Sequence, residues 1–407
     1  MKKVSFIHAA DLHLDSPMAG LRNLPQPILK RLRESTFAAL KKIVDAAIAN
    51  EVDFVVLAGD LYDGDDRSLK AQSRFRSEME RLSEKNIAVY AIHGNHDHLG
   101  GAWVKIAMPD NVHVFGAETE AVLHKGKSGA DVWIYGFSYP TRHVMDRRVQ
   151  TYEKRAGGDF HIGILHGNDG SSSEHGSYCP FTVGELIDRQ FDYWALGHIH
   201  KRAVLSESPP VIYPGNIQGR NRKETGEKGC YLVQLGENGA NLEFIESHDV
   251  IWKEIDISTK GALDFDSILR LCLDRKEKLR RNGLGTLLTL TLKDVSLEDR
   301  SEVDSLHSSL TELLQDGEEE ECSFVWVNRI SIEEETSWKR EELAAEADFY
   351  KELFQMSEEF GGLDDVLEPL YGRLPGRKYL SRLEKEEETR VLKDAEDLLV
   401  HLLREKG

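Results

Sequence analysis

Apolar runs alternate with stretches of helical periodicity over the first half of the chain. Three of the runs lie at 4–10, 53–59 and 87–94, and helical patterns at 25–50 and 67–86 separate them. Continuous apolar strands between helices are typical of a sheet that is covered on both faces. The pattern therefore predicts an α/β fold for this part of the chain.

Further apolar runs lie at 131–139, 161–167, 193–198, 210–215 and 230–235. The last four have little helix between some of them. Because short connections favour neighbouring strands, these four runs indicate a second sheet.

The pattern changes at Val250, where a compact unit of alternating strand and helix patterns begins. Its predicted elements are 250–258, 262–281, 286–294, 297–315 and 323–332. This β-α-β-α-β order predicts a small additional α/β domain.

The last part of the chain is charged and helical. Helical patterns cover 338–359 and 378–405, with breaks at 361–362 and 374–376. The last pattern carries a leucine stripe: Leu380, Leu383, Leu392, Leu399 and Leu402. Such a stripe either packs on the chain's own body or docks on a partner's coiled coil, as in helix-in-groove recognition.

Composition is that of a globular protein. The 407 residues are 40% hydrophobic and 30% charged, and no window approaches the roughly 20 apolar residues of a membrane span. Asp11 cuts short the first apolar run, which is unlike a signal peptide. The four cysteines stand far apart without a CxxC motif. We therefore expect reduced thiols in a cytoplasmic protein.

The net charge of −19 argues at first sight against a polyanionic partner such as DNA. The charge is uneven, because residues 331–407 hold 21 Asp and Glu against 12 Lys and Arg. Histidine is skewed the other way, with 13 of 16 in residues 1–200. Bound divalent ions would add positive charge locally, so the acidity does not exclude DNA.

Polar residues of the kinds that bind metals follow five of the predicted strands. They are Asp11, His13, Asp60, Asn95, His166, His198 and His200. In open α/β sheets the site lies beyond the carboxyl ends of the strands, so we expect these side chains to converge. Polar loop residues or packed core histidines would explain any one of them, but not the joint set.

The residue types select the metal. Carboxylates, imidazoles and an amide without thiolates suit Mn²⁺, Fe²⁺ or Zn²⁺. The set is too large for one ion and suits two, with Asp60 able to bridge them and a hydroxide between the ions as nucleophile for attack at phosphorus. Four adjacent glycines are expected to let the backbone turn sharply: Gly59, Gly94, Gly167 and Gly197.

The ordered motifs DLH, GDLYD, GNHD, HG and GHIH resemble those of the calcineurin-like metallophosphoesterase superfamily. FIHAADLHL resembles the SbcD-type DNA repair exonuclease branch, and within it the YhaO-like proteins. The resemblance implies a four-layer sandwich of two sheets flanked by helices. It also implies a nuclease domain at 1–248, an α/β capping domain at 249–335 and a helical tail for partner docking at 336–407.

The resemblance also implies roles for single residues. One metal would be held by Asp11, His13, Asp60 and His200, and the other by Asp60, Asn95, His166 and His198. His96 would meet the phosphate and protonate or stabilise the leaving oxygen, with Asp97 orienting it. His93, in contrast, is expected to be a packed strand residue.

Two positions depart from the family pattern. Asp15 stands where many relatives have glycine, and Asp63 stands where some relatives carry a second catalytic histidine. A basic loop follows at 219–229, in which Arg220, Arg222 and Lys223 are candidates for gripping a phosphate backbone. A solvated turn between two strands is the alternative for that loop.

These features predict a dinuclear-metal phosphoesterase. Within that class they favour a DNA exonuclease or endonuclease subunit that uses Mn²⁺. By the resemblance its partners would be DNA, an SbcC-like coiled-coil ATPase and a second copy of the chain. Two alternatives stay open: a phosphatase or phosphodiesterase for nucleotides or other small phosphoesters, and a non-catalytic scaffold. The complete ligand set argues against the scaffold.

Overall fold

The computed structural model describes residues 2–18, 24–64, 68–101, 103–170, 178–262, 264–295, 300–334, 340–371, 383 and 385–405. The chain divides into two compact units. Unit 1 comprises Met1–Ile257, Asp264–Thr291 and Asp299–Ser331. Unit 2 comprises Ser258–Leu263, Leu292–Glu298 and Ile332–Gly407.

The first sheet of unit 1 has six strands in the order β12-β11-β1-β2-β3-β4. β1 to β4 pair in parallel, whereas β11 is antiparallel to both β1 and β12. The strands are β1 (Lys3–Ala9), β2 (Phe54–Ala58), β3 (Ala88–Ile92), β4 (Val112–Val114), β11 (Gly229–Gly236) and β12 (Gly239–Glu246).

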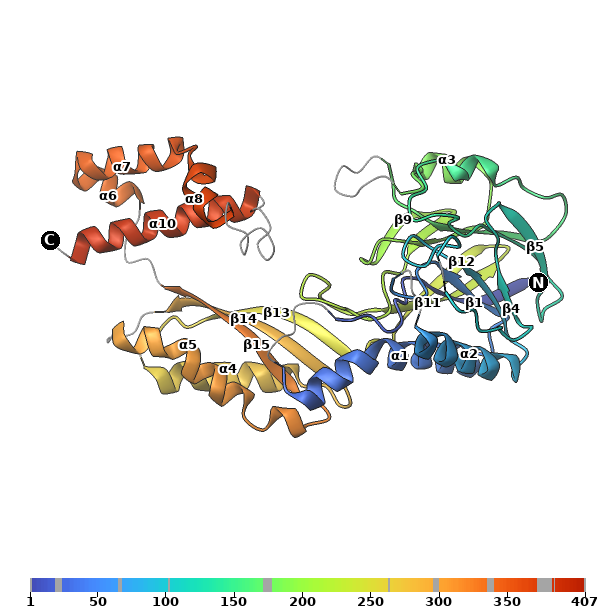
Figure 1. Cartoon of the computed structure of the whole chain (residues 1–407), viewed down its shortest axis with the longest axis horizontal. Coiled ribbons are helices and arrows are strands. Elements are labelled where there is room, and N and C mark those ends of the chain that lie inside the picture. The colour runs from blue at the N-terminus through green and yellow to red at the C-terminus, as the bar shows by residue number, and fades with distance from the viewer. Residues whose placement is uncertain are drawn as a thin grey trace. The chain divides into compact units, whose positions relative to one another are not determined.

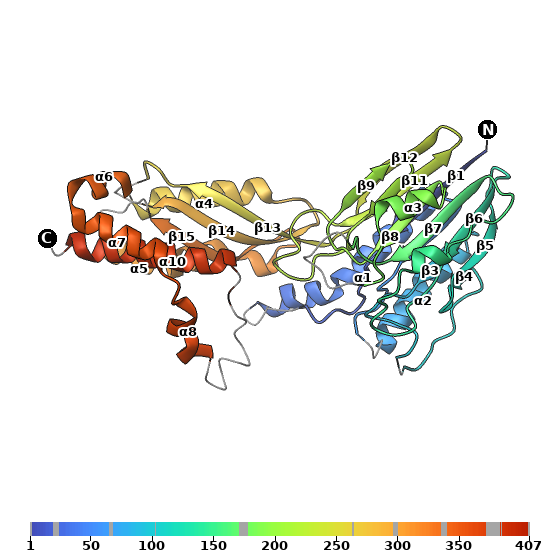
Figure 2. The same cartoon turned by 90° about the horizontal axis from the view of Figure 1, so that it is seen from above.

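The second sheet also has six strands, in the order β5-β6-β7-β8-β10-β9. Figure 2 shows β5, β6 and β7 of this sheet lying side by side. The strands are β5 (Glu120–Lys125), β6 (Asp131–Gly136), β7 (Phe160–His166), β8 (Tyr193–Gly197), β9 (Ala203–Glu207) and β10 (Pro210–Tyr213).

Buried side chains between the two sheets form the central core of unit 1. Helices α1 (Gln26–Ala49) and α2 (Leu69–Ser83) cover the other face of the first sheet. Helix α3 (Val183–Asp188) and the 3₁₀ turn η1 (Arg148–Thr151) pack on the other face of the second sheet. The predicted sandwich of two sheets flanked by helices is therefore confirmed (Figure 1).

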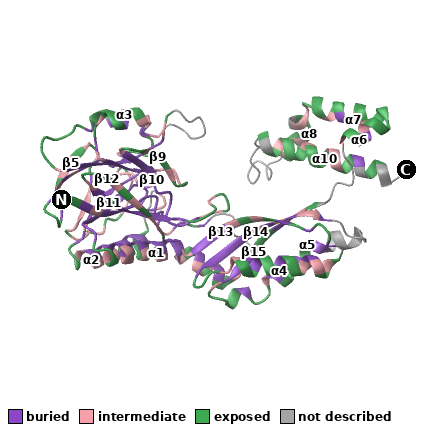
Figure 3. Ribbon diagram, turned by 180° about the vertical axis from the view of Figure 1, so that it is seen from behind, coloured by how far each residue is buried: buried purple, intermediate pink, exposed green. Residues whose placement is uncertain are grey.

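Local sequence explains these elements. Every residue of β7 is buried, as expected for a strand covered on both faces. Helix α2 begins after Ser68, whose hydroxyl accepts a hydrogen bond from the amide of Ala71 (3.0 Å). Figure 3 shows buried residues concentrated in the strands of both sheets. The strands β4, β5, β9 and β12 and helix α3 were not predicted, because their residues are mostly half-buried and mixed in polarity.

The region after Val250 has a three-stranded sheet in the order β13-β14-β15 with two helices. The N-terminal turns of α1 share a buried cluster with this sheet, including Ile28, Trp252 and Trp326. The elements are β13 (Val250–Ser258), α4 (Phe265–Leu279), β14 (Gly285–Val295), α5 (Arg300–Gln315), η2 (Glu318–Glu320) and β15 (Val325–Glu334).

Unit 2 is mostly helical. Its helices are α6 (Arg340–Glu346), α7 (Asp348–Glu359), α8 (Leu363–Tyr371) and α10 (Lys385–Glu405). A small core joins Leu343, Phe354 and Val400. Leu380 and the predicted break at 374–376 lie outside the described residues. Among the described helices, none is long and apolar enough to cross a membrane.

Candidate metal centre

The predicted ligands follow the carboxyl ends of three strands of the first sheet and two of the second. Asp11 and His13 follow β1, Asp60 follows β2, Asn95 follows β3, His166 ends β7, and His198 and His200 follow β8. The two sheets thus bring these side chains to one place, where they contact one another in two groups.

The backbone at this place is strained. Four of the candidate ligands adopt the left-handed conformation: Asp11 (φ 52°), His13 (φ 42°), Asp60 (φ 49°) and His198 (φ 100°). Such a conformation costs of order 1–3 kcal/mol for a residue other than glycine, and it clusters at functional sites. The fold therefore gives up some stability to aim these side chains.

The first group of candidate ligands surrounds a pair of imidazoles. The Nε2 atoms of His13 and His200 lie 3.1 Å apart. A carboxylate oxygen of Asp11 lies within 4.8 Å of both rings' ligand atoms. Asp60 Oδ2 lies 3.7 Å from His13 Nε2.

The Nδ1 atoms of His13 and His200 each face a carboxylate. His13 Nδ1 lies 3.2 Å from Asp63 Oδ1, and His200 Nδ1 lies 2.9 Å from Glu224 Oε1. Burial opposes charge on both carboxyls, but the hydrogen bonds from the imidazoles hold the pKa of Asp63 at about 2 and that of Glu224 below its usual range. Ionised carboxylates only accept, so each Nδ1 carries a proton, and Nε2 is the electron-pair donor of the neutral ring.

Two lone pairs that face each other at 3.1 Å repel. Burial and the nearby charge of Arg220 lower the pKa of His13, which opposes relief of this repulsion by a proton on His13. A cation between the two Nε2 atoms would relieve it. The donor set therefore fits a divalent ion at this position.

The second group of candidate ligands meets at His166. Its Nδ1 donates to the carbonyl oxygen of Ala58 (3.0 Å), while its Nε2 faces Asn95 Oδ1 (3.0 Å) and Asp60 Oδ2 (3.4 Å). His198 Nδ1 also lies 3.2 Å from Asn95 Oδ1. Electron-pair donors converge here as well.

The Asp60 carboxylate favours a positive charge at this second position. Burial alone would lower the pKa of His166, but the adjacent Asp60 carboxylate raises it to about 9. This raised pKa favours a proton on the ring of His166. A divalent ion among the same donors would take the place of that proton.

The glycines beside the candidate ligands have two roles. One turns the backbone, and others leave space for neighbouring atoms. Among the four glycines predicted to turn it, Gly59 has a left-handed backbone (φ 93°) and the others do not. A Cβ on Gly94 would lie 2.3 Å from Asp60 Oδ1, and one on Gly197 would lie 1.8 Å from the carbonyl oxygen of Ala58. Gly94 and Gly197 therefore allow these oxygen atoms to approach the backbone closely.

His96 lies at the rim of this centre. Its side chain is 33% exposed, and its ring lies edge-on to that of His13, with centroids 4.9 Å apart. Its backbone amide donates to Asp60 Oδ1 (2.9 Å). His96 is thus fixed through its backbone while its imidazole reaches the solvent side.

Asp97 contacts the loops after β2 and β3. Its Oδ2 accepts from His93 Nδ1 (2.8 Å) and from the amide of Leu61 (2.9 Å), and its Oδ1 accepts from the amide of Gly94 (2.8 Å). The ring of His96 has Asp63 Oδ1 at 3.5 Å from its Nδ1. Asp97 therefore ties the loop after β3 to the loop after β2.

Comparison with known proteins gives the family. The calcineurin-like phosphoesterase family matches residues 4–202. The chain is 42% identical over 406 residues to metallophosphoesterase YhaO of Bacillus subtilis, covering 98% of both proteins. The chain belongs to the calcineurin-like phosphoesterase family. The resemblance found from the five motifs is thereby confirmed.

Two further relatives of this metallophosphoesterase carry names that state an activity. One is DNA double-strand break repair protein Mre11 of Thermoplasma acidophilum, 25% identical over 60% of this chain and 65% of that protein. The other is the SbcD component of nuclease SbcCD from Staphylococcus saprophyticus, 25% identical over 60% of this chain and 68% of that protein.

A cavity of about 510 Å³ opens onto the candidate ligands of this metallophosphoesterase. Three lysines line it together with His96: Lys201, Lys223 and Lys228. Lys228 is buried, and its ammonium group donates to the carbonyl oxygen of His200 (3.0 Å). Cations beside a metal centre suit an anionic substrate. Lys228 lies in the basic loop at 219–229, whereas Lys201 was not predicted because it stands outside that loop.

The three candidate cations of the basic loop lie in different environments. Lys223 lines the cavity and Arg222 is exposed. Arg220 differs from the prediction: its side chain is only 14% exposed and is directed at Asp63 and Glu224. Its charge is therefore used inside the protein, where it is not available as a surface contact for a phosphate backbone.

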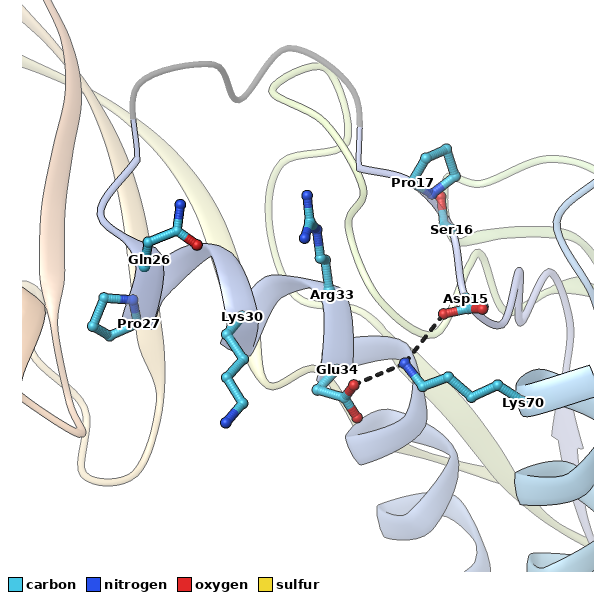
Figure 4. Close-up of a pocket in the computed structure, with 9 residues that line it drawn as sticks. All are labelled: Asp15, Ser16, Pro17, Gln26, Pro27, Lys30, Arg33, Glu34 and Lys70. Carbon is cyan, nitrogen blue, oxygen red and sulfur yellow. Dashed lines mark hydrogen bonds and ion pairs between the residues drawn. The ribbon is translucent and has the colours of Figure 1, made fainter. Parts of the chain in front are cut away.

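Asp15 lies beside the start of α2. Its backbone is left-handed (φ 64°), a conformation that glycine adopts without strain and that aspartate tolerates. Its carboxylate accepts from Ser68 Oγ (2.7 Å) and Lys70 Nζ (3.4 Å). Figure 4 shows Lys70 bridging Asp15 and Glu34 in a surface pocket of about 880 Å³. These contacts anchor α2 to the ligand-bearing loop.

Proposed function

We propose that this metallophosphoesterase is a DNA exonuclease or endonuclease subunit that hydrolyses phosphodiester bonds with two divalent ions, Mn²⁺ by preference. One observation carries the proposal: two clusters of lone-pair donors share Asp60 and lie beside a lysine-lined cavity. The similarity to Mre11 and to the SbcD component of nuclease SbcCD supports DNA as the substrate.

The ligands divide between two positions. Asp11, His13, Asp60 and His200 hold the first ion, and Asp60, Asn95, His166 and His198 hold the second. When bound, the ions supply Lewis-acid charge and activate water for attack on the phosphorus.

The chain's own groups then handle the substrate. Lys201, Lys223 and the exposed Arg222 bind phosphate oxygens, and phosphate contacts of this kind position a nucleic acid without reading its sequence. His96 stands at the cavity wall with its ring accessible, so it can protonate the leaving oxygen. Asp63, 3.5 Å from His96 Nδ1, orients the ring.

Partners follow from the remaining parts of the chain. We assign residues 1–248 to the nuclease domain, 249–335 to a cap that orients DNA and 336–407 to a docking tail. On α10, Leu399 and Leu402 are exposed, which supports docking of a coiled coil of an SbcC-like ATPase. A second copy of the chain is a further proposed partner, and the cytoplasm is the proposed location.

A second candidate function is hydrolysis of a nucleotide or another small phosphoester. The cavity volume of about 510 Å³ favours it, because pockets of about 300–1,000 Å³ are typical of small-molecule sites.

Substrate comparison separates the two functions. Wild type, His96→Ala and the control His307→Ala, which changes an exposed histidine of α5, are assayed with Mn²⁺ on labelled duplex DNA, single-stranded DNA and a small phosphodiester. We expect hydrolysis of DNA by wild type and the control, and its loss in His96→Ala. Rapid cleavage of the small ester alone would favour the second function, and full activity of His96→Ala would refute the role of His96.

A further inference from the structure

Three residues behind the first metal position contact one another as well as the histidines. Arg220 Nη1 donates to Asp63 Oδ1 (3.2 Å), and Arg220 Nη2 donates to Glu224 Oε1 (3.4 Å). The same two oxygens accept from His13 and His200. One guanidinium therefore joins the carboxylates that hold both imidazoles of this position.

The second oxygen of Glu224 is also occupied. Glu224 Oε2 accepts from Asn216 Nδ2 (2.8 Å) and from the backbone amide of Arg220 (2.8 Å). Neither Arg220 nor Glu224 can turn away easily, because their side chains are only 14% and 11% exposed. The arrangement is rigid.

We propose that Asp63, Arg220 and Glu224 form a clamp whose function is to hold His13 and His200 with their Nε2 atoms toward the first metal position, and so to set the metal affinity there. The proposal rests on the proposed function only in requiring that the site binds metal. It makes the three members of the clamp positioning residues that act through His13 and His200.

The physical reason is tautomer control. A carboxylate that accepts from Nδ1 keeps the proton on that atom and makes Nε2 a better donor to a cation. Arg220 keeps the two carboxylates in place and offsets part of their mutual repulsion. With one positive and two negative charges the clamp is negative overall, which favours a divalent cation next to it.

Metal titration of the full-length protein tests the clamp without using activity. Mn²⁺ is titrated by calorimetry into metal-free wild type, Glu224→Gln and the control Glu227→Gln, an exposed position of the same loop. A glutamine at 224 can accept on only one side, so it must present a donor either to His200 or to Asn216 and the amide of Arg220. We expect one of two binding steps to weaken by about 10–100-fold in Glu224→Gln, and neither step to change in Glu227→Gln.

A second pair of variants distinguishes positioning from a general structural role. Arg220→Met removes the link and should weaken the same step, whereas Arg220→Lys should recover part of the affinity. With Co²⁺ in place of Mn²⁺, the d–d absorption of the first-bound or second-bound ion should shift in the variants that lose affinity. If Glu224→Gln fails to fold, the Arg220 variants still test the clamp.

Two results would overturn the clamp. One is wild-type affinity at both steps in both Glu224→Gln and Arg220→Met, and the other is equal weakening of both steps. Failure of the proposed function looks different: the protein would bind two ions with the expected variant pattern and leave DNA intact.

Discussion

Replacing Gly94 with alanine should disable the metal centre while leaving the fold. The new Cβ would lie 2.3 Å from Asp60 Oδ1 and 2.7 Å from His166 Nε2, whereas ordinary contact begins near 3.4 Å. Neither neighbour can yield freely, because Asp60 Oδ1 accepts from the amide of His96 and the ring of His166 is held by the carbonyl oxygen of Ala58.

The required movement sets the size of the effect. Asp60 Oδ1 must move by about 1 Å to restore ordinary contact, and a displacement of about 1 Å in a catalytic site can cost about 10²-fold in rate. That loss corresponds to about 2.7 kcal/mol of transition-state stabilisation. Overpacking of this kind also costs about 1–3 kcal/mol of folding stability.

The assay is kcat/KM for Mn²⁺-dependent phosphodiester hydrolysis, read together with Tm. Gly184→Ala is the matched control, because a Cβ at Gly184 meets no atom within 4 Å. We expect a loss of about 100-fold in Gly94→Ala and no loss in the control. Full activity of a folded Gly94→Ala would refute the argument that the placement of Asp60 and His166 governs the reaction.

Three further predictions concern Glu318 and His166. Glu318→Ala should lower the free energy of unfolding by about 3–5 kcal/mol, measured by urea denaturation against the exposed control Glu319→Ala, because Lys276 would be left buried without its 2.7 Å ion pair. Burial opposes the charge of Glu318, but hydrogen bonds from Arg280 and Lys276 lower its pKa. The stability that Glu318 contributes should therefore be complete above pH about 4.3 and be lost as the pH falls through the lowered pKa. A difference in stability between variant and wild type that does not change with pH would contradict this. Because the pKa of His166 is about 9 without metal, Mn²⁺ affinity should rise by about tenfold per pH unit from pH 7 to 9, with proton release seen by calorimetry in different buffers; a flat profile would contradict it.

The sequence could predict that the candidate ligands converge because the relevant signal is local. Each candidate ligand follows an apolar run, and parallel strands within each sheet bring their carboxyl ends to one edge. Asp11, Asp60 and Asn95 could therefore be placed together from the sequence alone. His166 and His198 were expected on a second sheet, but the way the two sheets pack was not visible, since it depends on side chains far apart in the chain.

The supporting contacts could not be predicted for the same reason. Arg220 and Glu224 lie in a loop whose composition is that of a solvated turn, and only the folded chain directs them to Asp63 and His200. Gly94 was predicted to let the backbone turn, whereas in the structure it leaves space for the side chain of Asp60. Spacing in a sequence gives neighbours along a loop, and it does not give distances between loops.

Loss of Asp60 tests the central claim most directly, since Asp60 belongs to both groups of donors. Wild type and Asp60→Ala are loaded with Mn²⁺, their bound metal is counted, and cleavage of an end-labelled DNA duplex is measured on the same samples. The account predicts two ions and cleavage for wild type, and loss of both metal and cleavage for Asp60→Ala. A folded Asp60→Ala that keeps two ions and cleaves DNA at the wild-type rate would contradict it.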